Sequence, residues 1–110
     1  MADEQAELLK GTLDLLVLRT LSLAPLHGYG VALRIEQLTA GAFRIQGGSL
    51  FPALYRLERE GYLRSEWRKT ETGRRAKYYS LTRAGKRKLG EATRSWEHAS
   101  AGIARLLEAT

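Results

Sequence analysis

The stretch GGSLFPALYRLEREGYL, residues 47–63, constrains the fold most strongly because it predicts one short helix with two unlike faces. An apolar stripe recurs at helical spacing on one face and consists of Leu50, Leu54 and Leu57. The other face carries Ser49, Pro52, Arg56 and Arg59. We expect a helix over residues 48–60, with the Ser49 hydroxyl as its cap and Pro52 within its first turn.

A helix of this kind suits the reading of a DNA groove. Its start is built from small residues, its flank is basic and its back is apolar, so its first turn can approach phosphates and base edges. An ordinary surface helix packed on a core has the same stripe, and the stretch alone does not separate the two. The residues that follow it favour the first interpretation.

Positive charge is concentrated in the same part of the chain. The 110 residues carry a formal charge of +6, yet residues 42–88 alone hold 13 basic and 4 acidic side chains, a net of +9. The flanking segments are mildly acidic, so the positive charge forms a patch. A basic patch over a candidate recognition helix indicates an anionic partner such as DNA.

The sequence also excludes or disfavours several classes of protein. It has no cysteine, which excludes disulfides, zinc ribbons and thiol nucleophiles. The leucine-rich run near the N-terminus contains Asp14 and Arg19, so it is predicted to be neither a signal peptide nor a membrane span. His27 has no partners at catalytic or metal-ligand spacing, and we expect it to make a structural hydrogen bond. The prediction is a cytoplasmic protein that is not an enzyme, with no cofactor, no metal and no membrane partner.

Two further helices are predicted before the central one, over residues 7–23 and 28–38. The stripe of the first is Leu8, Leu9, Leu13, Leu16, Val17 and Thr20. Leu15 and Leu18 widen its apolar surface, which favours two partners, the core and a second subunit. The second helix is expected to turn Val31, Ile35 and Leu38 inward and Tyr29 and Arg34 away.

After Gly61 the pattern alternates, which predicts two strands over residues 62–69 and 74–81 joined by a turn. The tip of this ribbon carries Lys69, Arg74 and Arg75. A basic turn is usually only solvated, but directly after a candidate groove helix it favours a wing that grips phosphates or the minor groove.

Thr82 is expected to cap a last helix that runs to residue 108, where a seven-residue repeat predicts a seam for a partner helix. The seam is made of Leu89, Ala92, Trp96, Ala99, Ile103 and Leu106. It spans under three heptads, so we expect the first helix, through Leu8, Leu9 and Leu15, to enlarge the dimer interface. Trp96 either packs in this interface or borders a gap between the subunits.

Helix, helix, helix, ribbon and helix describe a mostly α chain with a two-stranded β-ribbon. The arrangement is a winged helix-turn-helix over residues 7–81, followed by a dimerisation helix over 82–108. At this point the sequence resembles the PadR family of bacterial transcriptional regulators over nearly its whole length. The resemblance rests on LDLLVLRTLSLAPLHGYG, GSLFPALYRLEREGYL and GRRAKYYSLTRAGKRKL, in that order. The single tail helix is similar to the short PadR subgroup.

The resemblance implies roles for individual residues. It makes Ser49, Pro52, Tyr55 and Arg56 major-groove and flanking phosphate contacts, and Tyr29 a backbone contact. It assigns Arg74, Arg75 and Lys77 to the wing. Arg59, on the polar side of the helix, and Lys69, at the ribbon tip, complete the predicted DNA-binding residues. Trp96 is similar to a tryptophan that lines an effector pore in some short members. Phe51 departs from the family, where tyrosine is common.

The expected function is therefore a dimeric repressor that reads a pseudo-palindromic operator with helix 48–60 and wing 69–77 and is relieved by a small aromatic effector. The prediction that the protein represses transcription, and does not activate it, comes from the resemblance alone. The alternative is a winged-helix module that binds structured RNA or a protein partner.

Overall fold

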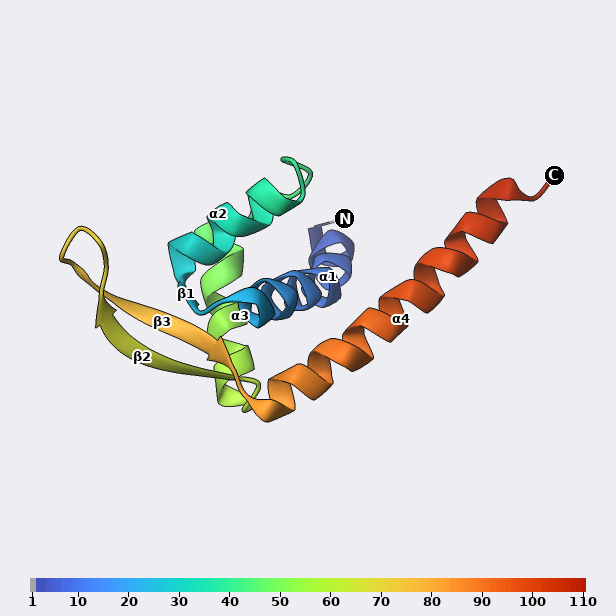
Figure 1. Cartoon of the computed structure of the whole chain (residues 1–110). Helices are drawn as coiled ribbons and strands as arrows, with labels where there is room; N and C mark the ends of the chain where they lie inside the picture. Colours follow the sequence, from blue (N-terminus) through green and yellow to red (C-terminus); the bar gives the residue numbers. More distant parts are fainter. Residues whose placement is uncertain (1) are drawn as a thin grey trace.

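The computed structural model describes the backbone of residues 2–110 and the side chains of residues 11–110. The elements along the chain are α1 (Ala2–Leu23), β1 (Leu26–His27), α2 (Gly28–Leu38), α3 (Gly47–Arg59), β2 (Leu63–Lys69), β3 (Arg75–Leu81) and α4 (Arg83–Glu108). The wing formed by β2 and β3 and the long helix α4 project in opposite directions from a helical body (Figure 1). This is the predicted winged helix-turn-helix with one long C-terminal helix.

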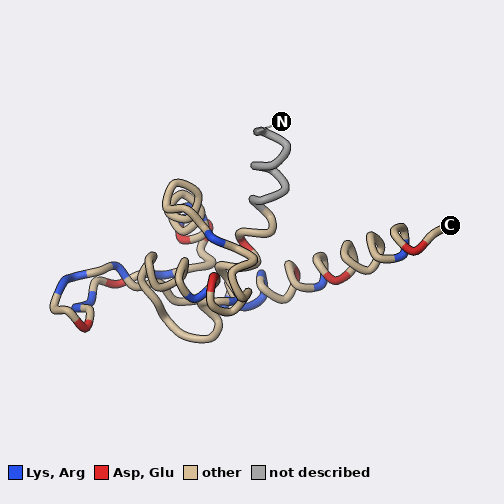
Figure 2. The backbone as a smooth tube through the Cα atoms, turned by 90° about the horizontal axis from the view of Figure 1, so that it is seen from above, with Lys and Arg blue, Asp and Glu red and all other residues tan. Residues whose placement is uncertain are grey.

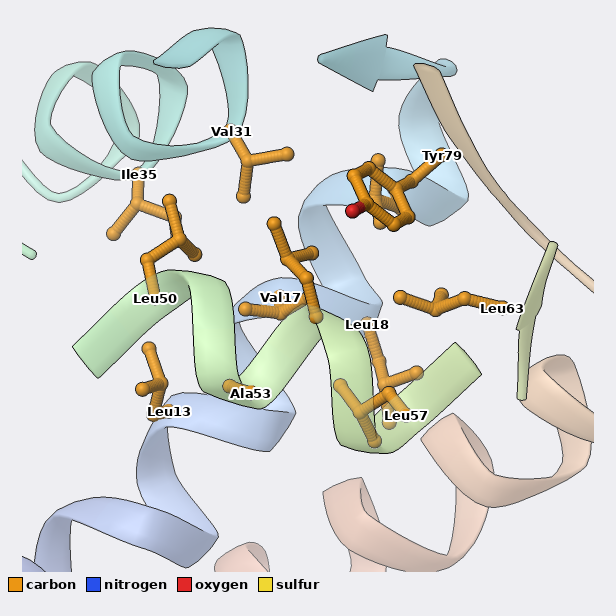
Figure 3. Packing of buried hydrophobic residues seen from close by; sticks show 12 residues of the cluster. Leu13, Val17, Leu18, Val31, Ile35, Leu50, Ala53, Leu57, Leu63 and Tyr79 are labelled. Atoms are coloured by element: carbon orange, nitrogen blue, oxygen red, sulfur yellow. The ribbon is translucent and has the colours of Figure 1, made fainter. Parts of the chain in front are cut away.

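The hydrophobic core lies where α1, α2, α3 and the base of the sheet meet (Figure 3). The predicted stripe of α3 is confirmed, because Leu50, Leu54 and Leu57 are all buried. Leu18 is also fully buried, so α1 contributes more than one stripe to the core. The prediction for Leu38 was wrong. It is 57% exposed, since α2 ends there and the core contact is made by Val31 and Ile35.

The predicted ribbon is present, and a short third strand joins it. The sheet is antiparallel in the order β1-β3-β2, with Leu26 paired to Tyr79 and Leu63 paired to Leu81. Only two residues form β1, too few for an alternating pattern to be visible in the sequence. Gly73 closes the turn between β2 and β3 at a φ of 85°, a conformation that glycine adopts without strain.

The start of α3 differs from the expectation in two respects. Gln46 is the N-cap and no side chain caps the helix, so the capping role predicted for the Ser49 hydroxyl was wrong. Because the helix begins at Gly47, Pro52 lies in its interior and not in its first turn. Proline removes a helical bond to the carbonyl oxygen of Gly48, and that residue is exposed, which lets water replace the missing donor.

Helix α4 begins as predicted, with the Thr82 hydroxyl accepting a hydrogen bond from the Gly85 amide at 3.0 Å. Its first turns pack against α1 and β3, and Leu89 touches the core. Beyond Ser100 every residue is exposed, so Ile103 and Leu106 of the predicted seam are not covered by any side chain of residues 11–110. The side chains of Leu8 and Leu9, through which the first helix was expected to enlarge the dimer interface, lie outside the described residues.

The helices of the described chain include none that is long and apolar enough to cross a membrane.

Candidate nucleic-acid interface

The outer face of α3 is the side opposite its buried residues. Leu50, Ala53, Leu54 and Leu57 face the core. At 100° per residue, the positions directly opposite are those of Gly48, Pro52, Tyr55 and Arg59, and all four are exposed. Tyr55 is 68% exposed although it is a large aromatic residue. The outer face of α3 therefore offers an aromatic ring and a guanidinium group to a partner.

A concave surface joins this face to the wing. It encloses about 410 Å³ and is lined by residues from the start of α2, from α3 and from both strands of the wing. Tyr29, 79% exposed, and Phe51 meet edge to face there with ring centroids 6.2 Å apart. Tyr29, Tyr55 and the wing thus lie on one side of the molecule.

Trp67 lines the same concave surface and was not among the predicted site residues. It is 60% exposed, and the Arg75 guanidinium lies 5.6 Å from its ring centroid. Its position was visible in the sequence, because it alternates in phase with Leu63 and Ser65, which puts it on the strand face toward α3.

The tip of the wing carries three of the cations of the predicted site. Lys69, Arg74 and Arg75 are all exposed, and Figure 2 shows Lys and Arg gathered at the hairpin end, together with an acidic residue of the turn. The Thr70 amide donates to the Arg74 carbonyl at 2.6 Å and thereby closes the turn. Side chains on this tip can reach an extended anionic partner.

Arg56 is placed differently from the expectation. One of its terminal nitrogens lies 2.5 Å from Asp14 of α1, and the other lies 3.4 Å from Glu60. The side chain is only 21% exposed. The hydrogen bond with Asp14 raises the pKa of the guanidinium above its ordinary value. Its charge is therefore committed to the junction of α1 and α3 and is not free on the outer face.

We expect Arg56→Met to lower the free energy of unfolding by about 1–3 kcal/mol, because it leaves the half-buried Asp14 carboxylate without its partner. Arg59→Met on the same helix removes an exposed charge and should change stability by less than about 0.5 kcal/mol. Urea unfolding of both variants at one protein concentration measures the difference. Equal stabilities of the two variants would contradict a stabilising ion pair between Arg56 of α3 and Asp14 of α1.

The charge of Lys77 is also paired within the protein. Its ammonium lies 3.1 Å from a Glu58 carboxylate oxygen, and the other oxygen of Glu58 accepts from the Ser65 hydroxyl at 2.5 Å. The Ser65 hydrogen bond and then Lys77 lower the pKa of the Glu58 carboxyl, while Glu58 raises the pKa of Lys77. Because the Glu58 pKa is lower in the folded protein, this contact stabilises the fold above the ordinary carboxyl pKa. That contribution is lost as the pH falls through the folded value.

The structural role expected of His27 is confirmed. It is the N-cap of α2, where its Nδ1 accepts from the Gly30 amide at 3.1 Å. Its ring meets Tyr78 of β3 edge to face at a centroid distance of 5.3 Å. Residues 11–110 contain no cluster of three or more His, Asp or Glu side chains able to hold a metal ion.

The PadR-like family of transcriptional regulators matches this sequence over residues 17–91, which cover the end of α1, all of α2 and α3, the wing and the start of α4. The chain belongs to the PadR-like family. The predicted resemblance is therefore confirmed, and the protein is a regulator of transcription that acts through DNA. The outer face of α3 and the wing are its candidate DNA interface.

Solved structures of PadR-like and other regulators share the fold along nearly the whole chain. A PadR family transcriptional regulator from Eggerthella lenta is 34% identical, covers 99% of this chain and 93% of its own, and has a TM-score of 0.77. A transcriptional regulator from Clostridium thermocellum is 26% identical with a TM-score of 0.83, covering 93% of this chain and 99% of its own. The transcriptional regulator Rv3488 of Mycobacterium tuberculosis is 39% identical over 62 residues, 56% of this chain and 57% of that protein.

Proposed function

We propose that this PadR-like protein is a dimeric repressor that reads a pseudo-palindromic operator. In this proposal the exposed face of α3, with Ser49, Pro52, Tyr55 and Arg59, enters the major groove. The wing tip, with Lys69, Arg74 and Arg75, contacts the neighbouring backbone or minor groove, and Tyr29 contacts the backbone beside α3. The observation that supports it is the concave surface shared by α2, α3 and the wing, which Tyr29 and Tyr55 line together with residues of both wing strands.

A second subunit is supported by the apolar side chains that α4 leaves uncovered. Trp96, Ile103, Leu106 and Leu107 are between 54% and 79% exposed. Leucine and isoleucine exposed at heptad spacing are expected to be buried by a partner helix, and a two-fold dimer places two reading helices on two half-sites. The proposed interface also includes Leu15, Leu89, Ala92 and Ala99.

The wing assignment is tested by changing Arg74 and Arg75 together to alanine. Two lost phosphate contacts should reduce the log–log salt slope by about 1.8 and weaken binding by roughly 30-fold near 0.15 M salt. The loss should be similar on operator and random DNA, because phosphate contacts carry no sequence information. Wild-type affinity and slope in the double variant would refute the proposed wing contacts.

We also propose that a planar aromatic molecule relieves repression by binding beside Trp96. An apolar cavity of about 500 Å³ lies between α1, α2 and α4, and Trp96 lines it together with Leu15, Leu16 and Phe43. An indole that is 54% exposed at such a cavity can stack on a flat ring. Titration of flat cationic dyes in a Trp67→Phe background should quench Trp96 fluorescence. An unchanged signal across a panel of dyes would refute the pocket.

A competition assay with labelled operator DNA distinguishes the proposed function from the alternative, a module that binds structured RNA or a protein. Under the proposed function, unlabelled operator displaces labelled operator at far lower concentration than hairpin RNA of equal length does. The reverse order would favour the RNA-binding alternative.

A further inference from the structure

Glu58 on α3 connects the reading helix to both strands of the wing. One carboxylate oxygen accepts from the Ser65 hydroxyl of β2 at 2.5 Å, and the other lies 3.1 Å from the Lys77 ammonium of β3. The three side chains therefore form a small polar cluster, which we call the wing bracket. It links α3 to β2 and β3, the ribbon that projects from the body in Figure 1.

The ammonium of Lys77 is enclosed by more than Glu58. It lies 5.2 Å from the ring centroid of Tyr55 on α3 and 5.5 Å from that of Tyr79 on β3. Both rings offer it an electron-rich face. The Lys77 side chain is 28% exposed and the Glu58 side chain 29%, so the pair is partly shielded from solvent and screened less than a surface pair.

Beyond the wing bracket the ribbon has few supports. On β2 every residue from Glu66 to Lys69 is exposed, and on β3 so is Arg75. Strands rise about 3.3 Å per residue, so Arg74, three residues from Lys77, lies roughly 10 Å further out. A small change in angle at the wing bracket is therefore enlarged at the cationic tip.

We propose that Glu58 and Lys77 are positioning residues that hold the wing at a fixed angle to α3, and that Lys77 does not contact DNA phosphates. The inference rests on the proposed DNA binding by α3 and the wing tip. It reassigns Lys77, which the family resemblance had placed among the DNA-binding residues of the wing. The geometric reason is that its charge, although the side chain lines the concave surface, already faces a carboxylate and two rings.

This proposal and a purely electrostatic view predict opposite changes in operator affinity for one substitution. Glu58→Gln removes a negative charge near the DNA face and frees Lys77. If charge alone mattered, operator binding would become tighter and its salt slope steeper, by about 0.9 if Lys77 gained a phosphate. If the wing bracket positions the wing, the variant loses ordered contacts at the tip. Binding then becomes weaker and the slope shallower.

The experiment compares operator binding of wild type, Glu58→Gln and Glu60→Gln across a series of salt concentrations. Glu60→Gln is the matched control, because it makes the same change on the same helix but faces Arg56 and not the wing. We expect Glu58→Gln to bind about tenfold more weakly with a slope reduced by up to about 1.8, and Glu60→Gln to bind as tightly as wild type or more tightly. Operator binding by Glu58→Gln equal to or tighter than wild type overturns the proposal.

Ser65→Ala provides a second variant that leaves every charge in place. It breaks the bond from β2 to Glu58, so it should weaken binding and flatten the slope in the same direction, with its fold confirmed by circular dichroism. If Ser65→Ala binds the operator like wild type, the proposal is overturned. This test also holds if Glu58→Gln fails to fold.

The wing-tip variant separates this inference from the proposed function. In the Arg74→Ala, Arg75→Ala background, Glu58→Gln should have a much smaller effect than in wild type, because two of the three tip cations that it misplaces are already gone. Additive losses would show that Glu58 acts elsewhere. If the wing-tip variant alone binds like wild type, the proposed wing contacts fail. If it binds weakly while Glu58→Gln does not, only the wing bracket fails.

Discussion

Replacing Gly85 with alanine is expected to lower the free energy of unfolding by about 3 kcal/mol or more. A Cβ at this position would lie 2.1 Å from the carbonyl oxygen of Tyr62 and 3.2 Å from a methyl group of Leu81. The Tyr62 carbonyl cannot move away easily, because it accepts the Thr82 amide at 3.1 Å. Movement of α4 instead would break the hydrogen bond that the Thr82 hydroxyl donates to the Gly61 carbonyl at 2.6 Å, worth about 1 kcal/mol.

Gly90→Ala is the matched control on the same helix. Its Cβ would meet only the terminal nitrogen of Arg94, at 3.4 Å, and that flexible side chain can turn aside. Alanine is the better helix former, so this variant should be more stable by up to about 1 kcal/mol. Urea unfolding at a fixed protein concentration compares the two. Similar stabilities for the two variants would contradict the tight packing of α4 against the loop before β2.

The second large effect is expected from Ile103→Asp combined with Leu106→Asp. Both side chains are more than half exposed in the single chain, so the fold of one subunit should survive. In the proposed dimer they lie in the seam, where unpaired carboxylates are strongly unfavourable. We expect a monomer by sedimentation and a loss of operator affinity of about 100-fold or more, because linked binding to two half-sites disappears.

A control of equal charge is His98→Asp combined with Ala101→Asp, two exposed positions on the opposite side of α4. This variant should remain dimeric and keep most of its operator affinity. If both variants remain dimeric, the seam is not the dimer interface. If both become monomeric, charge on α4 and not the seam determines assembly.

Local patterns in the sequence were sufficient to predict the elements and much of the core. The stripe of α3, the ribbon after Gly61, the Thr82 cap and the His27 hydrogen bond all follow from spacing and residue type within a few neighbours. Such features depend on periodicities of 3.6 and 2 residues and on turn chemistry, which a single sequence displays directly.

Contacts between side chains of different helices and strands could not be predicted in the same way. Arg56 and Arg59 are similar in sequence, yet one turns to Asp14, which is 42 residues away, and the other faces solvent. Lys77 was grouped with the wing cations because its contact with Glu58 depends on how the ribbon folds back on α3. Leu38 was misplaced because periodicity indicates a face but not where along the helix the core ends.

The central claim is that two copies of this protein place α3 and the wing on two half-sites of one operator. Hydroxyl-radical footprinting on DNA selected by the protein tests it most directly. The account predicts two related protected half-sites about one helical turn apart, with the wing-tip variant losing protection at their edges. A single unpaired protected site, or protection without sequence preference, would contradict it.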